Sequence, residues 1–217
     1  MGNSEFLNYL LQFPTEDTPQ LPSLKDLSQE LGISISTLRE QLQVAKALGL
    51  VDVRPRLGIR PQPYSFTPAV DASLCYAIEQ DRENFEDFVD LRRHLELAYF
   101  PQALDLLQEE DHQELRELVA SAWKKLRGKP ARIPHQEHRQ LHLAFYRRLE
   151  NVFVTGLLEA YWDAYEAVGL NVYTDFEYLE QVWTYHEELV AIAIARDTAR
   201  GRKILQEHFE LMDRMVR

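Results

Sequence analysis

The sequence predicts a mainly α-helical protein: a small helical domain with a two-stranded hairpin, followed by a larger all-α bundle. Two observations lead to this prediction. Residues 21–60 contain two short runs with apolar residues at helical spacing, each ended by glycine, and then a segment in which apolar and polar residues alternate. Beyond residue 68, apolar residues recur at helical spacing in long runs, and no strand alternation is present.

The first short helix is predicted to begin after Ser23. Serine is a favoured N-cap, because its side-chain oxygen accepts a hydrogen bond from an unpaired N–H of the first turn. Gly32 follows the run and is typical of a helix C-terminus. The apolar positions of this helix are Leu24, Leu27 and Leu31.

A second helix is predicted after a turn of about three residues, capped by Ser34 or Ser36 and ended at Gly49. This arrangement is typical of a helix-turn-helix. Its apolar stripe comprises Leu38, Leu42, Ala45 and Leu48. The opposite face presents side chains that can meet phosphates and base edges: Ser34, Ser36, Thr37, Arg39, Gln41 and Lys46.

A basic hairpin is predicted next. Residues 50–53 alternate as a strand, residues 54–58 form a turn, and residues 59–60 return, with arginine at positions 54, 56 and 60. Such a wing contacts the DNA backbone or minor groove. The N-terminal domain is therefore predicted to be a winged helix-turn-helix; the alternative is a generic helical hairpin with solvated arginines.

These residues resemble the winged helix of GntR transcription regulators, in the FadR-like branch. The resemblance is carried by Leu21-Pro22-Ser23, Leu31-Gly32-Ile33-Ser34, Leu38-Arg39-Glu40, Leu48-Gly49-Leu50-Val51 and Arg54-Pro55-Arg56-Leu57-Gly58. It implies a double-stranded DNA operator as partner. Ile35 occupies a position that is usually basic in that branch, so one expected contact is missing. The DNA-binding residues expected from the face, the wing and the resemblance are Lys25, Ser34, Ser36, Thr37, Arg39, Arg54, Arg56 and Gly58.

Composition supports an ordinary globular chain of one or two domains, with 217 residues and 45% hydrophobic content. Residues 61–68 carry three prolines and read as a semi-rigid linker. We therefore predict a DNA-binding domain over residues 1–64, a linker over 65–68, and a helical domain for metal or effector binding and dimerisation over 69–217.

The charge is unevenly distributed. Residues 1–64 carry a net charge of −1 out of −11 for the whole chain, so long-range attraction to DNA is weak and a homodimer with two DNA-reading modules is expected. With the single Cys75, no intramolecular disulfide can form. The first residues lack a basic region followed by a long apolar core, and no long apolar run follows, so a cytoplasmic protein without membrane attachment is expected.

The second domain is predicted to consist of helices over residues 70–79, 83–107, 111–127, 134–150, 152–168, 176–196 and 198–216. His138 and His142 are four residues apart, which places both imidazoles on one helix face. His186 and His208 lie about ten residues on either side of a turn, so an antiparallel helix pair brings them to one level. We predict that the four histidines converge on one metal site.

This part of the chain resembles the FCD effector-binding domain of GntR regulators, on the segments 138–142, 186–189 and His208. In metal-binding members, one Asp and three His hold a divalent ion, and His138 stands here at the Asp position. The exchange favours Zn, Ni or Cu over Mn or Mg. Alternatively, His142, His186 and His208 form a three-histidine site without His138.

The same resemblance implies a small carboxylate as effector. Arg92 lies in the ligand-binding place of the Arg-x-x-x-Glu segment, and Asn151 is a second candidate contact. Alternatively, Arg92 only pairs with Asp90 or Glu96 across a helical turn.

Two rival functions use the same histidines. Three histidines with an open metal position also build hydrolytic zinc sites, with Glu137 or Glu187 as base. However, no HExxH or nucleophile motif is present, so no catalytic residue is expected. The other rival is a purely structural metal site. The sequence is therefore interpreted as that of a metal-containing, carboxylate-responsive transcription regulator, with repression as the expected mode.

Overall fold

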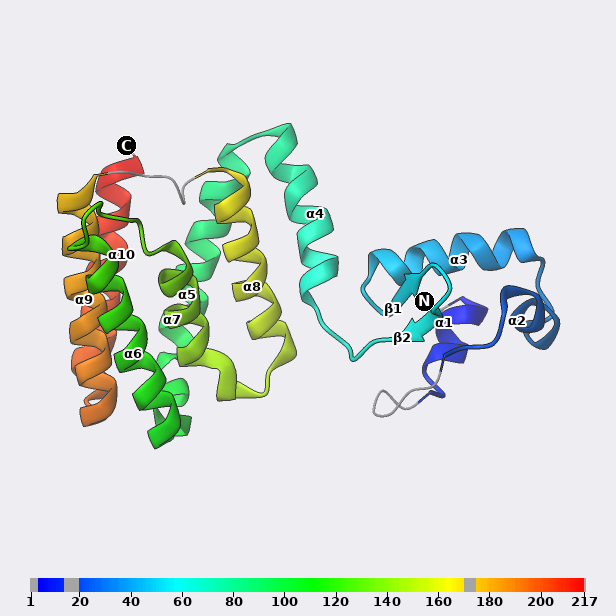
Figure 1. Ribbon diagram of the computed structural model, residues 1–217, viewed down its shortest axis with the longest axis horizontal. Coiled ribbons are helices and arrows are strands. Elements are labelled where there is room, and N and C mark those ends of the chain that lie inside the picture. Colours follow the sequence, from blue (N-terminus) through cyan, green and yellow to red (C-terminus); the bar gives the residue numbers. More distant parts are fainter. Residues whose placement is uncertain (1–3, 14–19, 170–174, 217) are drawn as a thin grey trace. The chain divides into compact units, whose positions relative to one another are not determined.

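The computed structural model describes residues 4–13, 20–169 and 175–216. The chain forms two compact units, Met1–Ser73 and Leu74–Arg217. Figure 1 shows the elements of each unit.

The first unit has the winged helix-turn-helix fold that the sequence predicts. Ser23 and Ser34 cap its second and third helices, each accepting a hydrogen bond from a first-turn N–H, and Gly32 ends the second helix in the left-handed conformation (φ 67°). The hairpin pairs antiparallel, with Val53 opposite Ile59. The elements are α1 (Glu5–Leu10), α2 (Leu24–Leu31), α3 (Ile35–Ala47), β1 (Val51–Arg54) and β2 (Gly58–Pro61).

Helix α1 is not among the predicted elements. Ser4 caps it, and its Phe6 and Tyr9 are buried in the core of the unit. The backbone N–H of Phe6 donates to Oε1 of Gln41 at 2.9 Å, and Nε2 of Gln41 donates to Glu5 at 2.6 Å. Gln41 is half-buried and holds α1, a role that its position on the outer face of the second predicted helix did not indicate.

The second unit is an all-α bundle, as predicted. Helices α5 and α7 lie between α8 on one side and α9 and α10 on the other (Figure 1). Its apolar core includes Phe100, Leu115, Phe145 and Leu189. The helices are α4 (Thr67–Gln80), α5 (Glu83–Leu106), α6 (Glu109–Leu126), α7 (His135–Tyr146), α8 (Val152–Ala167), α9 (Phe176–Ala195) and α10 (Thr198–Val216).

Two helix boundaries differ from the sequence-based prediction by more than two residues. Helix α4 begins at Thr67, inside the predicted linker, because proline is accepted in the first turn of a helix and Pro68 stands there. The division between the two units falls within α4. The predicted helix over 134–150 is α7 followed by a 3-10 turn, Arg147–Leu149, which ends at Glu150 in the left-handed conformation. In the described part of the chain, no helix is long and apolar enough to cross a membrane.

Candidate functional site

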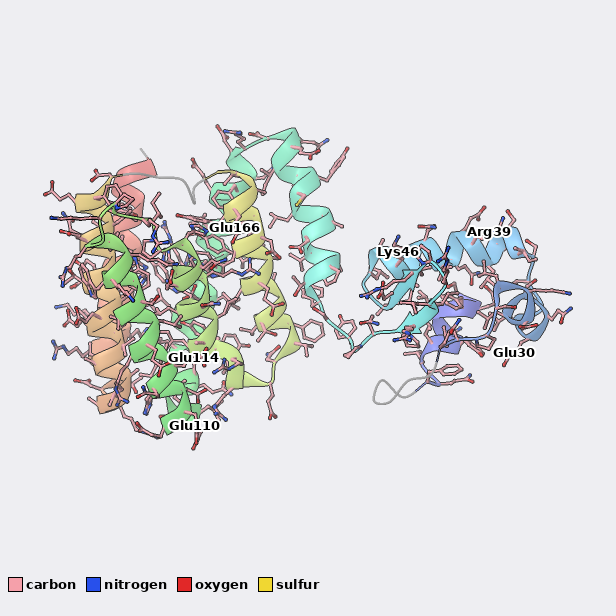
Figure 2. All side chains as sticks on the ribbon, in the orientation of Figure 1. Glu30, Arg39, Lys46, Glu110, Glu114 and Glu166 are labelled. Carbon is pink, nitrogen blue, oxygen red and sulfur yellow. The ribbon has the colours of Figure 1, made fainter. Side chains whose placement is uncertain are left out.

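The predicted DNA-binding residues of α3 lie on the surface of the first unit. Ser34, Ser36, Thr37 and Arg39 are exposed. Arg39 projects from the same helix as Lys46 (Figure 2). Ser34 also has a local role, because its hydroxyl accepts from the N–H of Thr37 at 3.1 Å and lies 2.9 Å from the Thr37 hydroxyl. The start of α3 therefore presents an ordered polar edge.

The predicted contacts outside α3 are also accessible. Lys25, Arg54 and Arg56 are exposed, and Gly58 is half-buried at the start of β2. Gly58 has φ 72°, a conformation that residues with a Cβ atom rarely adopt, so the backbone favours glycine at this position. Arg54 pairs with Asp52 at 2.6 Å, so part of its charge is neutralised within the wing.

One departure limits the positive charge of this face. Ile35, the first residue of α3, is 40% exposed where a basic residue would add a phosphate contact. An exposed isoleucine supplies no charge to attract the DNA backbone. The positive charge of the first unit therefore comes from a few exposed side chains, among them Lys25, Arg39, Lys46 and Arg56.

The four predicted histidines come together in the second unit. His138 and His142 lie on α7, His186 on α9 and His208 on α10, and all four are buried. The ring centroids of His138 and His142 are 5.1 Å apart, and those of His186 and His208 are 4.6 Å apart. The i,i+4 pair and the height-matched pair thus meet in one cluster, whose potential ligand atoms lie within 4.8 Å of one another.

Burial keeps the imidazoles uncharged. It lowers the pKa of His138, His186 and His208 well below the ordinary value, and neighbouring positive charge lowers it further. Burial also lowers the pKa of His142, although the carboxylate of Glu96 opposes this effect. All four rings are therefore neutral near pH 7, which is the form that binds a metal.

Several polar atoms of the cluster lack protein partners. Within the described residues, Nε2 of His138, Nδ1 of His186 and both ring nitrogens of His208 have no hydrogen-bond partner, although these rings are at least nine-tenths buried. Buried polar atoms normally have a partner, and leaving one without costs about 1–3 kcal/mol. This is the expected state of ligand atoms for an ion.

The cluster fits a divalent metal with a preference for nitrogen ligands. In a tetrahedral zinc site, nitrogen atoms about 2.0–2.1 Å from the ion are about 3.3–3.4 Å apart. Nε2 of His142 and Nε2 of His186 are 3.2 Å apart. The remaining ligand atoms require only a small inward movement of side chains to reach that spacing, because none of the pairs exceeds 4.8 Å.

Arg92 lies beside the histidines and pairs with Glu96. Nε of Arg92 donates to Oε1 of Glu96 at 2.5 Å, and both side chains are buried. The guanidinium carbon is 4.1 Å from the ring centroid of Tyr161 and 4.9 Å from that of Trp162. The helical-turn pairing and the position near the predicted metal site therefore occur together.

The sequence indicates Glu96 only as a possible partner of Arg92, and its contact with the histidine cluster was not predicted. Its Oε2 lies 2.9 Å from Nδ1 of His142, and its charged neighbours keep its pKa low despite burial, so it is ionised. The signal in the sequence was the four-residue spacing from Arg92, which indicates a pair but does not place it against His142.

Asn151 is not brought to the cluster. Its side chain caps α8 by accepting from the N–H groups of Phe153 and Val154 at 3.1 and 3.3 Å. Trp162, the α8 residue that contacts Arg92, lies about 16 Å further along the helix at 1.5 Å per residue. The prediction that Asn151 contacts the effector has no support from this geometry.

The two candidate bases of the enzyme alternative point elsewhere. Glu137 accepts from Ser121 at 2.8 Å and pairs with Lys125 at 2.7 Å. Glu187 accepts from Nε1 of Trp123 at 3.1 Å. Neither carboxylate has a described contact with the histidine cluster, so a metal-bound water there would lack the proposed base.

A separate cavity of about 710 Å³ lies among α6, α7 and α8. None of the four histidines lines it. Its charged lining is mainly acidic, with Glu114, Glu117, Glu137 and Glu159 against Arg147. This charge does not suit a carboxylate, so the cavity is not the expected effector site.

Comparisons with known proteins give one match to the second unit and several to nearly the whole chain. The family model of the FCD domain matches residues 87–211. Among solved structures, a Streptococcus agalactiae GntR protein is similar with a TM-score of 0.67 at 16% identity, covering 97% of this chain and 96% of that one. E. coli McbR/YncC is similar with a TM-score of 0.54 at 21% identity, covering 91% of this chain and 87% of that one. No curated protein matches the sequence.

Proposed function

Because the chain belongs to the FCD-domain family of GntR-type regulators, we propose that it is a homodimeric DNA-binding repressor that responds to a small carboxylate at a metal-containing site. The observation that carries the proposal is the buried cluster of four neutral histidines beside Arg92, in a chain that also has a winged helix-turn-helix. As an operator-binding protein it acts in the cytoplasm.

The DNA-binding role is supported by the exposed polar edge of α3. We propose that Ser36, Thr37 and Arg39, which are exposed on α3, contact the major groove, and that the exposed Lys25 and Arg56 contact phosphates. The first 64 residues carry a net charge of −1, so one module gains little from long-range attraction. Two modules held at a fixed spacing would raise affinity without additional charge.

The metal centre is proposed to consist of His142, His186 and His208, with His138 as fourth ligand, and to hold Zn or Ni. When bound, the ion supplies positive charge that attracts a carboxylate. Arg92 adds a second cation at the same place. Effector binding is proposed to shift the bundle and thereby the spacing between the two modules of the dimer.

A purely structural metal site is the second candidate. The observation in its favour is the burial of all four histidines, which limits access for an effector. In that case the ion raises the melting temperature and leaves DNA affinity unchanged.

Selection from a random-sequence duplex library tests the DNA-binding proposal. We expect enrichment of a site with two related halves. Fluorescence anisotropy with the enriched duplex is then measured in EDTA, in Zn²⁺, and in Zn²⁺ with a panel of small carboxylates. A change of affinity with zinc and one carboxylate supports the regulator; an effect of zinc on melting temperature alone supports the structural site. Failure to enrich any duplex would overturn the proposed function.

A further inference from the structure

The carboxylate of Glu96 contacts both Arg92 and the histidine cluster. Oε1 accepts from Nε of Arg92 at 2.5 Å, and Oε2 lies 2.9 Å from Nδ1 of His142. The Glu96 side chain is fully buried. Each oxygen therefore has its own partner, and the two partners belong to the proposed effector contact and the proposed metal centre.

The contact with His142 determines where the imidazole carries its hydrogen. An ionised carboxylate only accepts hydrogen bonds, so Nδ1 of His142 must carry the hydrogen in this contact. A neutral imidazole protonated at Nδ1 has its lone pair at Nε2. Nε2 is the atom that faces Nε2 of His186 at 3.2 Å. Glu96 therefore leaves the inward nitrogen of His142 available to a metal.

A rival hydrogen bond exists at the same nitrogen. The Nη2 atom of Arg92 is 3.1 Å from Nδ1 of His142. Arginine can only donate, so this contact would require the lone pair at Nδ1 and would move the hydrogen to Nε2, where it blocks the metal. The two contacts select opposite tautomers, and the carboxylate favours the metal-binding one.

We propose that Glu96 is the positioning residue of the metal centre, holding His142 in the tautomer that binds metal through Nε2 and restraining Arg92 with its other oxygen. This inference rests on the metal centre of the proposed function. Outer-shell carboxylates of this kind typically change metal affinity by about 10–100-fold.

The test compares zinc affinities, measured by competition with a chromophoric chelator. In Glu96→Gln, the amide oxygen is expected to remain with Arg92, because hydrogen bonds to a charged donor are stronger. The amide N–H₂ then donates to Nδ1 of His142 and imposes the wrong tautomer. We expect zinc affinity to fall about 10–100-fold, with weaker visible absorption bands when Co²⁺ replaces zinc.

Glu137→Gln is the matched control. Glu137 is also a buried glutamate in an ion pair, and it lies next to His138 on α7, but its partners are Lys125 and Ser121. Loss of a buried ion pair near the site is thus reproduced without touching His142. We expect zinc affinity to stay close to the native value, well short of the loss of about 10–100-fold that is typical of outer-shell partners, because Glu137 does not contact His142.

A double variant separates positioning from structural support. In Arg92→Met with Glu96→Gln, the amide oxygen is free to accept from Nδ1 of His142, and the rival donor is gone. Zinc affinity should recover toward the native value. The double variant also removes the buried charge of Arg92, which in Glu96→Gln has lost its carboxylate partner and can oppose folding.

Equal zinc binding by the native protein and Glu96→Gln would overturn the inference, as would a double variant that binds no more tightly than Glu96→Gln. If the native protein itself binds no zinc, the proposed metal centre fails, and this inference fails with it.

Discussion

Replacing His208 by leucine is expected to stabilise the metal-free protein and to destabilise the metal-loaded one. His208 is 0% exposed, and neither of its ring nitrogens has a hydrogen-bond partner among the described residues. Folding without metal therefore removes the imidazole from water with no replacement for its hydrogen bonds. Leucine has a similar volume and no polar side-chain atom.

The magnitude follows from those two nitrogens. A buried polar group without a partner costs about 1–3 kcal/mol, so removing the imidazole should raise the free energy of unfolding by about that amount, less any loss of shape fit. For a chain of this size, each kcal/mol raises the melting temperature by about 2–4 °C. Zinc at a thousandfold excess over its Kd stabilises the native protein by about 4.1 kcal/mol, more than the whole expected gain from leucine. The variant lacks a ligand and loses most of that gain.

Thermal unfolding in EDTA and in excess Zn²⁺ measures both effects. The variant should melt above the native protein in EDTA and below it in zinc. His112→Leu is the control, because His112 is also buried, and its Nε2 has no partner in the described part of the chain, but it lies on α6 outside the cluster. It should change both melting temperatures equally. If the His208→Leu variant is destabilised in EDTA, or is stabilised by zinc as much as the native protein, His208 is not an unpaired metal ligand.

Three further changes have expected outcomes. Burial raises the pKa of Asp111, but hydrogen bonds from Arg148, Arg147 and the backbone of Gln108 lower this pKa to about 2. The ionised Asp111 therefore contributes about 2 kcal/mol of stability above about pH 4, and this contribution is lost as the pH falls toward 2. The denaturant midpoints of the native protein and Asp111→Asn should differ at neutral pH and converge near pH 2. Ile35→Arg should tighten operator binding and steepen its salt dependence by about 0.9 for each new phosphate contact, measured by anisotropy; an unchanged slope would contradict this. Gly201→Ala places a Cβ 2.6 Å from Cε1 of Phe100, so the free energy of unfolding, measured by urea denaturation, should fall by about 1–3 kcal/mol; an unchanged value would contradict this.

The elements that the sequence predicted well are those with local signals. Ser23, Ser34 and Gly32 define helix ends through hydrogen bonds and backbone conformations within a few residues, and the structure has them in these roles. The short α1 has one such signal, its cap at Ser4, but its six residues are also held by burial of Phe6 and by the distant side chain of Gln41, which no local pattern indicates.

The histidine cluster was predictable because helical periodicity converts sequence spacing into position. A spacing of four residues brings the rings of His138 and His142 together on α7. Equal distances from the turn between α9 and α10 bring those of His186 and His208 to one level. The role of Glu96 was not predictable in this way, since it depends on how α5 packs against α7. The effector role predicted for Asn151 overlooked a local signal, because its side-chain oxygen caps the start of α8.

The central claim is that His138, His142, His186 and His208 hold a divalent metal ion. Mass spectrometry of the purified protein under non-denaturing conditions, after exposure to Zn²⁺ and removal of the excess, tests it most directly. We expect one ion per chain in the native protein and none in His186→Ala. A native chain without metal, or a His186→Ala chain that retains the same ion, would contradict it.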